Sequence, residues 1–429
     1  MQSQLLSSIA MMLATHSCRI LPRVTRETCK RFSSSYRTVK EFDVLFLRQQ
    51  GVKFPKWHLT APIRHDAHVK LSYGASVAAS DLIGKQILER TVDDQGNTVA
   101  IHEPTLASYI VNSVRSATPI YPSDAETIVS LLELNPTRPG EDDDDQGRPD
   151  NDGAPFEVFE AGTGMGSLSL HIARALHAAN PPVSAHLRHV LRSSPLARNV
   201  VAAGNVLELP ASDAAILAAY RASRRAVLHT LDRSGKHTRA AYKLVRHFRR
   251  AQYLADMDFH VGTVDDYVAA RLAASGGRPI FARAVLDLPA AHTHGADRLI
   301  RALHPNAVLV LFNPSISQIA EFQSWALTTG APLRLEKVLE LPTTSTADGV
   351  RDGGCGGRHW DVKIVRPKPA PSEDGTQGAC PSEEQEPVVV MRPKVGGRVA
   401  GGGFIAVYRK WPEGVNRQQP EEPEEEAEE

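Results

Sequence analysis

A glycine-rich stretch between an apolar strand and a helix constrains the fold of this chain more than any other feature. Residues 156–161 (FEVFEA) have the length and composition of a buried strand, and the glycine stretch at 160–167 reads EAGTGMGS. A helical segment, SLSLHIARALHAA, follows directly. Glycines at such a junction turn the chain tightly and let a ligand approach the backbone. The pattern therefore predicts a ligand-binding loop after a strand of a parallel sheet.

The same alternation of strand and helix continues along the chain. Apolar strands are predicted at 226–231 (AVLHTL), 282–288 (ARAVLDL) and 307–312 (AVLVLF), and a final strand at 403–411 (GFIAVYRKW). Strands of this kind, each followed by a helical stretch, indicate an α/β fold with a doubly wound sheet covered on both faces. The domain that holds this sheet is expected to span residues 116–411.

Residues 41–115 differ from the rest of the chain. They contain short apolar runs and turn signals such as DDQGN, which indicate a small N-terminal β-rich domain. Three further segments interrupt or follow the larger domain. We expect an acidic loop at 141–152, an insertion at 182–225, and a long loop or low-complexity insertion at 343–397 that is rich in Gly, Pro and charge.

The formal charge of the chain is zero, with 49 basic and 49 acidic residues, but the charges are segregated. Residues 1–40 carry +6, whereas residues 141–152, 371–386 and the disordered acidic tail predicted at 412–429 are strongly acidic. The rest of the chain is left with an excess of about +12. A basic folded body permits an anionic partner such as RNA.

The N-terminal segment 1–40 has an apolar stretch followed by basic, Ser- and Thr-rich sequence, with Glu27 as its one acid. This order is typical of a mitochondrial transit peptide, and an ordinary disordered extension is the alternative. No apolar run approaches the ~20 residues that a membrane span requires, so no membrane association is expected.

Two features distinguish the glycine stretch from a dinucleotide site. Its spacing is not G-x-G-x-x-G followed by an acid about 20 residues on. In addition, Glu160 precedes the first glycine, where a carboxylate would repel a pyrophosphate but suit a cationic ligand. S-adenosylmethionine carries a sulfonium and an amino group and no phosphate, so the stretch favours this cofactor.

Acidic residues stand at the ends of the next three strands. Asp232 could accept the ribose hydroxyls of an adenosyl group or cap the following helix. After the strand DFHVGTV, Asp265 or Asp266 could face the adenine amino group or cap a helix. Asp287 could accept a proton near the transferred group, or be a solvated residue at a strand end.

A metal site is not expected. The four cysteines, Cys18, Cys29, Cys355 and Cys380, lack paired spacing. The histidine groups at 58–68 and 292–294 lack cysteine or carboxylate partners at ligand spacing.

Cations recur at helical spacing in residues 236–250 (KHTRAAYKLVRHFRR). They indicate either a stripe that contacts RNA phosphates or the solvated face of a packed helix. The five cations are Lys236, Arg239, Lys243, Arg246 and Arg250.

Several segments together resemble a known family. They are HEPTLASYIVNSVRSATPIYPSDA (102–125), EAGTGMGSLSL (160–170), HTLD (229–232), LDLPAA (286–291) and LHPNAVLVLFNPSISQ (303–318). In this order they resemble the catalytic subunit of tRNA (adenine-58-N1)-methyltransferase. HEPTL and TPIYPSD are closer to the single-subunit bacterial and mitochondrial type than to the two-subunit nuclear type.

The resemblance implies a class I methyltransferase (Rossmann-like) fold with a small N-terminal β domain. It implies transfer of a methyl group from S-adenosylmethionine to N1 of adenosine 58 in the tRNA T loop, without a metal. The alternatives are a methyltransferase of the same fold acting on another RNA site, and a non-catalytic RNA-binding subunit. The family forms tetramers, either of one chain or with a non-catalytic sister subunit. The implied location is mitochondrial, with a nuclear one as the alternative.

The resemblance also implies roles for individual residues. Asp232 matches the ribose-binding acid, and Asp287 matches the catalytic Asp that takes up a proton as N1 of adenine attacks the methyl group. The glycine triplet at 401–403 stands where many relatives have His-Thr-Gly. The loop that would hold the methionine end of the cofactor, where Met165 replaces a small polar residue, comprises Gly162, Thr163, Gly164, Met165, Gly166 and Ser167.

Overall fold

The computed structural model describes residues 37–136, 154–197, 207–346, 360–365, 388–393 and 398–412. The predicted acidic loop, the four cysteines, most of the predicted transit peptide and all but the first residue of the acidic tail lie outside these ranges. Residues 37–40 are described, and they belong to the N-terminal domain. Val39 is buried there and Thr38 forms a β-bridge with Gln86. In the described ranges, no helix has the length and apolarity to cross a membrane.

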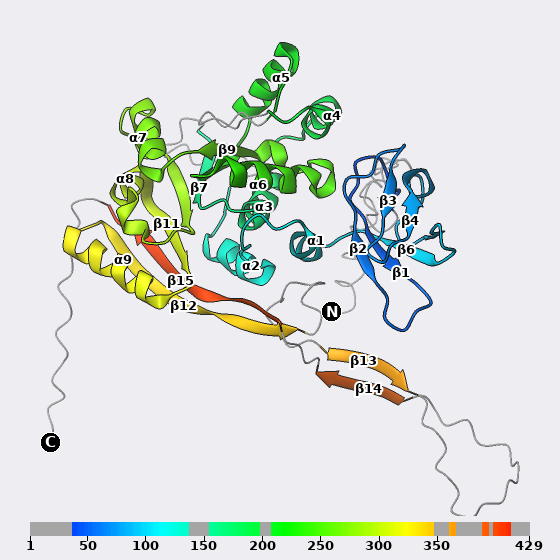
Figure 1. Ribbon diagram of the computed structural model, residues 1–429. Helices are drawn as coiled ribbons and strands as arrows, with labels where there is room; N and C mark the ends of the chain where they lie inside the picture. Colours follow the sequence, from blue (N-terminus) through cyan, green and yellow to red (C-terminus); the bar gives the residue numbers. More distant parts are fainter. Residues whose placement is uncertain are drawn as a thin grey trace, which may run out of the picture.

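A seven-stranded sheet forms the centre of the larger domain (Figure 1). Its strand order is β12-β15-β11-β10-β7-β8-β9. The five strands from β11 to β9 run parallel, whereas β15 is antiparallel to both of its neighbours. The strands are β7 (Phe156–Ala161), β8 (Ala226–Asp232), β9 (Met257–Val261), β10 (Phe281–Leu286), β11 (Leu303–Asn313), β12 (Leu333–Thr346) and β15 (Arg398–Lys410).

Helices cover both faces of this sheet, as the doubly wound prediction requires. Successive side chains of a strand point to opposite faces, so Val158 of β7 packs into one core and Phe159 into the other. The first core is covered by α1 (Leu106–Asn112), α2 (Pro122–Leu131), α3 (Ser167–Leu176), α4 (Ala185–Ser193), α5 (Ala211–Ala222) and α6 (Gly235–His247). The second is covered by α7 (Val264–Ala274), α8 (Ala296–Ala302) and α9 (Ile316–Thr329).

The small N-terminal β domain is confirmed. Its four-stranded sheet has the order β2-β1-β6-β5, and β3 pairs with β4 beside it around a separate apolar core. Helix α1 falls within the range predicted for this domain but packs on the larger one, where the Tyr109 hydroxyl donates to the Leu244 carbonyl of α6. The strands are β1 (Phe46–Gln49), β2 (Trp57–Leu59), β3 (His68–Lys70), β4 (Ser76–Ala78), β5 (Arg90–Val92) and β6 (Thr98–His102).

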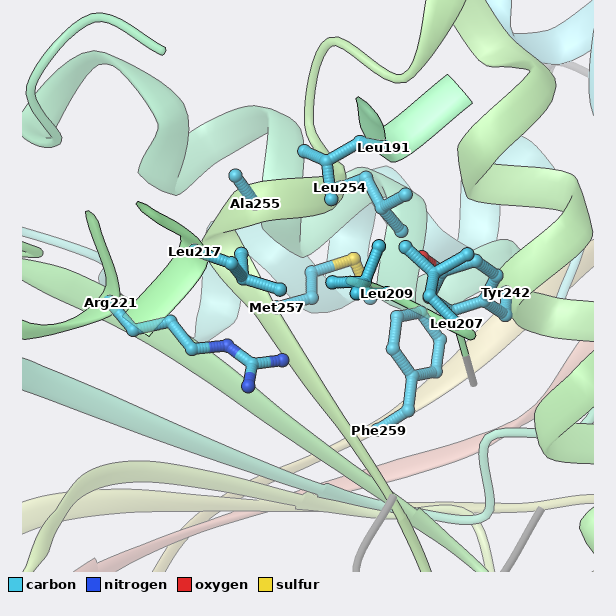
Figure 2. A pocket seen from close by; sticks show the side chains of 10 residues that line it. All are labelled: Leu191, Leu207, Leu209, Leu217, Arg221, Tyr242, Leu254, Ala255, Met257 and Phe259. Atoms are coloured by element: carbon cyan, nitrogen blue, oxygen red, sulfur yellow. The ribbon is translucent and has the colours of Figure 1, made fainter. Parts of the chain in front are cut away.

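The insertion at 182–225 contributes α4 and α5. They enclose a small cavity of about 50 Å³ against α6 and the first residues of β9 (Figure 2). Leu191, Leu217, Tyr242 and Met257 are among the mostly apolar residues that line it. A cavity of this size and character is a packing defect under the inserted helices and does not have room for a cofactor.

The prediction of a loop throughout 343–397 is wrong for its described parts. Strand β12 continues to Thr346, and β13 (Trp360–Val365) pairs antiparallel with β14 (Val388–Pro393). Runs of β-branched residues, TTST at the end of β12 and VVV at the start of β14, favour strands and outweigh the surrounding Gly and Pro.

Candidate active site

The glycine loop joins β7 to α3, and its three glycines have positive φ angles. A Cβ at Gly162 would lie 2.3 Å from the Asp287 carbonyl oxygen, and one at Gly166 would lie 2.8 Å from the Ala241 Cβ in α6. These two glycines are therefore required by close packing. At Gly164 the nearest atom to such a Cβ is 3.8 Å away, so the loop is open there and its backbone is accessible to a ligand.

The other loop residues have side chains that face the protein interior. The Thr163 hydroxyl lies 2.6 Å from that of Thr230 in β8, and the Ser167 hydroxyl donates to the Ile120 carbonyl at 2.5 Å. Met165 is 2% exposed and packs in the first core, which explains how the loop accommodates this larger residue. In this conformation these three residues can offer a cofactor only backbone atoms.

Asp232 ends β8 directly beside the loop. Its Oδ2 accepts a hydrogen bond of 3.0 Å from the Gly164 backbone N–H, and its Oδ1 accepts one of 2.8 Å from Ser234. The N-cap of α6 is Ser234, whose hydroxyl accepts from the His237 N–H. The capping alternative for Asp232 is therefore wrong, and its carboxylate lies against the open part of the loop.

Asp287 follows the last residue of β10 and crosses the loop at Gly162. Its backbone N–H donates to the Ala161 carbonyl at 2.9 Å. Burial raises the pKa of Asp287 to about 7, and the charge of Asp232 acts in the same direction. Asp287 is only partly exposed, so the alternative of a fully solvated strand-end acid does not hold.

Glu160 lies beneath the loop, where it is 1% exposed and accepts a hydrogen bond of 2.5 Å from the Ser169 hydroxyl. Burial raises its pKa to about 7, and the charges of Asp287 and Asp232 add to this effect. Direct contact with a cofactor through its carboxylate is not favoured by this placement. Its contribution is electrostatic, since it adds a third carboxyl group to the region around the loop.

The two acids after β9 have different surroundings. Asp266 donates its backbone N–H to the Thr263 hydroxyl, which in turn donates to the Asp266 carboxylate at 2.7 Å, so Thr263 is the N-cap of α7 and Asp266 is part of the capping arrangement. Asp265 instead forms an ion pair of 2.5 Å with Arg298 of α8 and is partly exposed. Of the pair, Asp265 is the one not used by the cap. The preceding strand ends at Val261, earlier than predicted.

The segment TPIYPSDA borders the loop, a role that the residue patterns did not reveal. The Ile120 backbone carbonyl accepts a hydrogen bond from the Ser167 hydroxyl, and the buried Asp124 accepts one from the Gly402 backbone. Burial raises the pKa of Asp124 to about 6. The sequence feature that could have indicated this role is Asp124, an acid in the first turn of the otherwise apolar helix α2. Gly402 and Gly403 both have positive φ, so backbone geometry explains two of the three glycines in the triplet at 401–403.

The predicted cationic stripe on α6 is interrupted. Lys236 and Lys243 are exposed, but Arg246 is only 8% exposed and donates to the carbonyls of Arg192 and Ser194. Arg239 likewise donates to the Ala197 carbonyl. The prediction that Arg246 contacts RNA is therefore wrong, because the inserted segment covers this part of the helix. Arg250 lies beyond the end of α6.

No group of three or more potential metal ligands is assembled among the residues that the structure describes.

The sequence was also compared with known proteins. No protein-family profile matches it. Proteins named tRNA (adenine(58)-N(1))-methyltransferase TrmI, from two strains of Thermus thermophilus, are 25% identical to it over 269 residues. The alignment covers 63% of this chain and 70% of each relative.

The fold has a counterpart among solved structures. A SAM-dependent O-methyltransferase from Thermotoga maritima superposes with a TM-score of 0.51 at 13% identity, over 89% of this chain and 97% of that one. This likeness and the strand order confirm the predicted class I methyltransferase fold.

Proposed function

We propose that this chain, which is related in sequence to the tRNA (adenine(58)-N(1))-methyltransferases, transfers a methyl group from S-adenosylmethionine to N1 of adenosine 58 in tRNA. One observation carries the chemical part of this proposal. The carboxyl groups of Glu160, Asp232 and Asp287 lie around the glycine loop; burial raises the pKa of Glu160 and Asp287, and the charges of neighbouring carboxylates raise it further. A site of this kind favours a cationic ligand.

The loop suits S-adenosylmethionine, which supplies an electrophilic methyl group on a positively charged sulfur. Gly164 leaves its backbone open to the ligand, and Asp232 lies beside it at the carboxyl end of β8, where an acid can accept ribose hydroxyls. Asp265, in the first turn of α7, would have to exchange its ion pair with Arg298 for the adenine of the cofactor. The negative charges of Glu160, Asp232 and Asp287 around the loop would disfavour a phosphate-bearing cofactor.

Asp287 is the residue that we assign to the reaction. N1 of adenine attacks as a neutral nucleophile, the carbon–sulfur bond breaks as the nitrogen–carbon bond forms, and the purine becomes cationic. The Asp287 carboxylate stabilises this charge or accepts a proton from the exocyclic amino group. A pKa near 7 suits a general base that works at neutral pH. The target base must leave its stack to reach this partly covered group.

The proposal is tested by incubating the purified chain with unmodified tRNA and S-adenosylmethionine and locating 1-methyladenosine by mass spectrometry. We expect modification at adenosine 58 and none in a transcript that carries guanosine there. Methylation of other RNAs instead would favour the second enzymatic alternative. A chain that does not bind S-adenosylmethionine in calorimetry would favour a non-catalytic RNA-binding subunit.

Cofactor binding is expected to release protons near neutral pH. With a pKa of about 7, Glu160 and Asp287 are each about half protonated at pH 7 in the free protein. A bound sulfonium lowers both pKa values, so up to roughly one proton leaves on binding. Calorimetry in buffers of different ionisation enthalpy measures this release. It should vanish at pH 9, where both groups are already ionised.

S-adenosylhomocysteine provides the matched control, because it lacks the sulfonium charge. It should release fewer protons than S-adenosylmethionine. Equal release by the two ligands would show that the carboxyl groups do not respond to the charge on sulfur.

A further inference from the structure

Five arginines gather where the N-terminal domain meets the inserted helix α4. We call them the arginine cluster; its members are Arg37, Arg188, Arg192, Arg249 and Arg250. Arg37 precedes β1, Arg188 and Arg192 lie on α4, and the last two form a turn after α6. The Arg188 guanidinium donates to the Arg249 carbonyl at 3.1 Å. Burial lowers the pKa of Arg188, and the charges of Arg250, Arg192 and Arg37 lower it further, so the four groups interact directly.

Two carboxylates partly neutralise the cluster. Asp43 forms ion pairs with Arg37 at 2.8 Å and Arg250 at 3.2 Å, and Glu103 forms ion pairs with Arg37 at 3.2 Å and Arg249 at 3.6 Å. Five guanidinium groups thus share two acids, which leaves an excess of positive charge.

The two arginines of the insertion differ from the other three. The recorded contacts of the Arg188 and Arg192 guanidiniums are to a backbone carbonyl, to a histidine ring and to the ring of Phe42. The buried Nε of each has no hydrogen-bond acceptor within the described part of the chain, a property that they share with Arg37. These Nε atoms are buried and out of reach of a ligand, so a ligand would bind the outer guanidinium nitrogens of these partly exposed side chains.

The turn that carries Arg249 and Arg250 has an unusual backbone. Arg249, Arg250 and Ala251 have φ angles of 46°, 56° and 60°, so three successive residues other than glycine are left-handed. Such residues are energetically unfavourable, and strain of this kind persists where the surroundings hold it in place. The turn brings the Arg249 carbonyl to Arg188 and the Arg250 side chain to Asp43, so it holds the cluster together.

We propose that the arginine cluster binds phosphate groups of the RNA backbone at a point outside the methylation pocket. This inference rests on the proposed function, because it takes tRNA as the ligand. Guanidinium groups pair with phosphate oxygens in a bidentate manner, and Arg188 and Arg192 are partly exposed and form no ion pair with Asp43 or Glu103. The excess charge exceeds what one phosphate neutralises, which favours a polyanion over a small anion. The insertion at 182–225 thereby gains a role in substrate binding.

The test compares the full-length chain with an Arg188→Gln/Arg192→Gln variant in binding unmodified tRNA over a range of salt concentrations. We expect roughly tenfold weaker binding and a slope of log Kd against log salt that falls by about 1 to 2. The KM for tRNA should rise while kcat and the affinity for S-adenosylmethionine stay unchanged. Arg301→Gln is the matched control, since Arg301 is exposed on α8 and pairs with Asp297. It should leave every one of these values unchanged.

Two further variants keep the test decisive. Arg188→Lys/Arg192→Lys retains the charge and should recover most of the salt slope. If the double glutamine variant does not fold, Arg249→Gln removes a 44% exposed member of the cluster and should lower the slope by about 1. An unchanged salt slope and an unchanged tRNA affinity in a folded variant overturn the inference. It is also overturned if the wild-type chain binds anionic lipid vesicles and the variant loses this binding while it still binds tRNA normally. If the chain binds tRNA but does not methylate it, the proposed function fails. The tRNA-binding measurements still decide whether the arginine cluster binds phosphate groups.

Discussion

Asp287→Asn is expected to lower the single-turnover rate of tRNA methylation by about 10²–10⁴-fold, while S-adenosylmethionine still binds. Asparagine keeps the size of the side chain but cannot accept a proton or balance the charge of the methylated purine. The backbone bond from Asp287 to Ala161 does not involve the side chain and is retained. The measurement is single-turnover methylation of tRNA, combined with calorimetric titration of the cofactor.

The wild-type pH profile should reflect the same group. Because burial raises the pKa of Asp287 to about 7, its carboxyl is neutral below this pH and cannot accept a proton. We expect kcat/KM for S-adenosylmethionine, which reports on the free protein, to fall about tenfold per pH unit below pH 7 and to level off above it. Asp266→Asn is the matched control, since Asp266 is part of the capping arrangement of α7 and should leave the rate unchanged. A fast Asp287→Asn variant would remove Asp287 from the mechanism.

Gly162→Ala is expected to have the largest effect on stability, and to abolish methylation as well. The added Cβ would lie 2.3 Å from the Asp287 carbonyl oxygen, and the φ of 98° is unfavourable for any residue with a Cβ. Overpacking typically costs about 1–3 kcal/mol and a left-handed backbone about 1–2 kcal/mol more. The thermal unfolding midpoint, measured without cofactor, should therefore fall by several degrees.

Gly164→Ala separates the two causes of this loss. Gly164 also has a positive φ, of 53°, but no atom lies within 3.8 Å of an added Cβ. It should show only the backbone cost of about 1 kcal/mol. Equal unfolding midpoints for the two variants would mean that the contact between the loop and Asp287 does not contribute to stability.

The sheet was largely predictable from the sequence. Strand β7 has the predicted bounds, because a short run with apolar residues facing both sides, directly before a glycine-rich turn, has a clear signature. The positions of Asp232 and Asp287 beside the loop followed from this, since the carboxyl ends of parallel strands meet at one edge of a sheet. The parts of the site that depend only on where the parallel strands end could therefore be predicted from the sequence.

Side-chain direction and burial within the loop were not predictable. Thr163 and Ser167 face inward because Thr230 and Ile120, distant in sequence, supply partners for their hydroxyls. Arg246 was assigned to a surface stripe because helical spacing shows which residues share a face but not what covers that face. The carbonyls that cover it belong to the inserted segment.

The contact between Gly162 and Asp287 has an evolutionary consequence. The cofactor loop and the strand end that carries the acid assigned to catalysis are packed backbone against backbone, so position 162 must stay glycine whatever residue stands at 287. A descendant that acquired a side chain at position 162 would need a shifted β10 terminus to survive, and such a shift would displace the acid from the methyl donor. Selection for catalysis and selection for folding therefore both act to keep glycine at position 162.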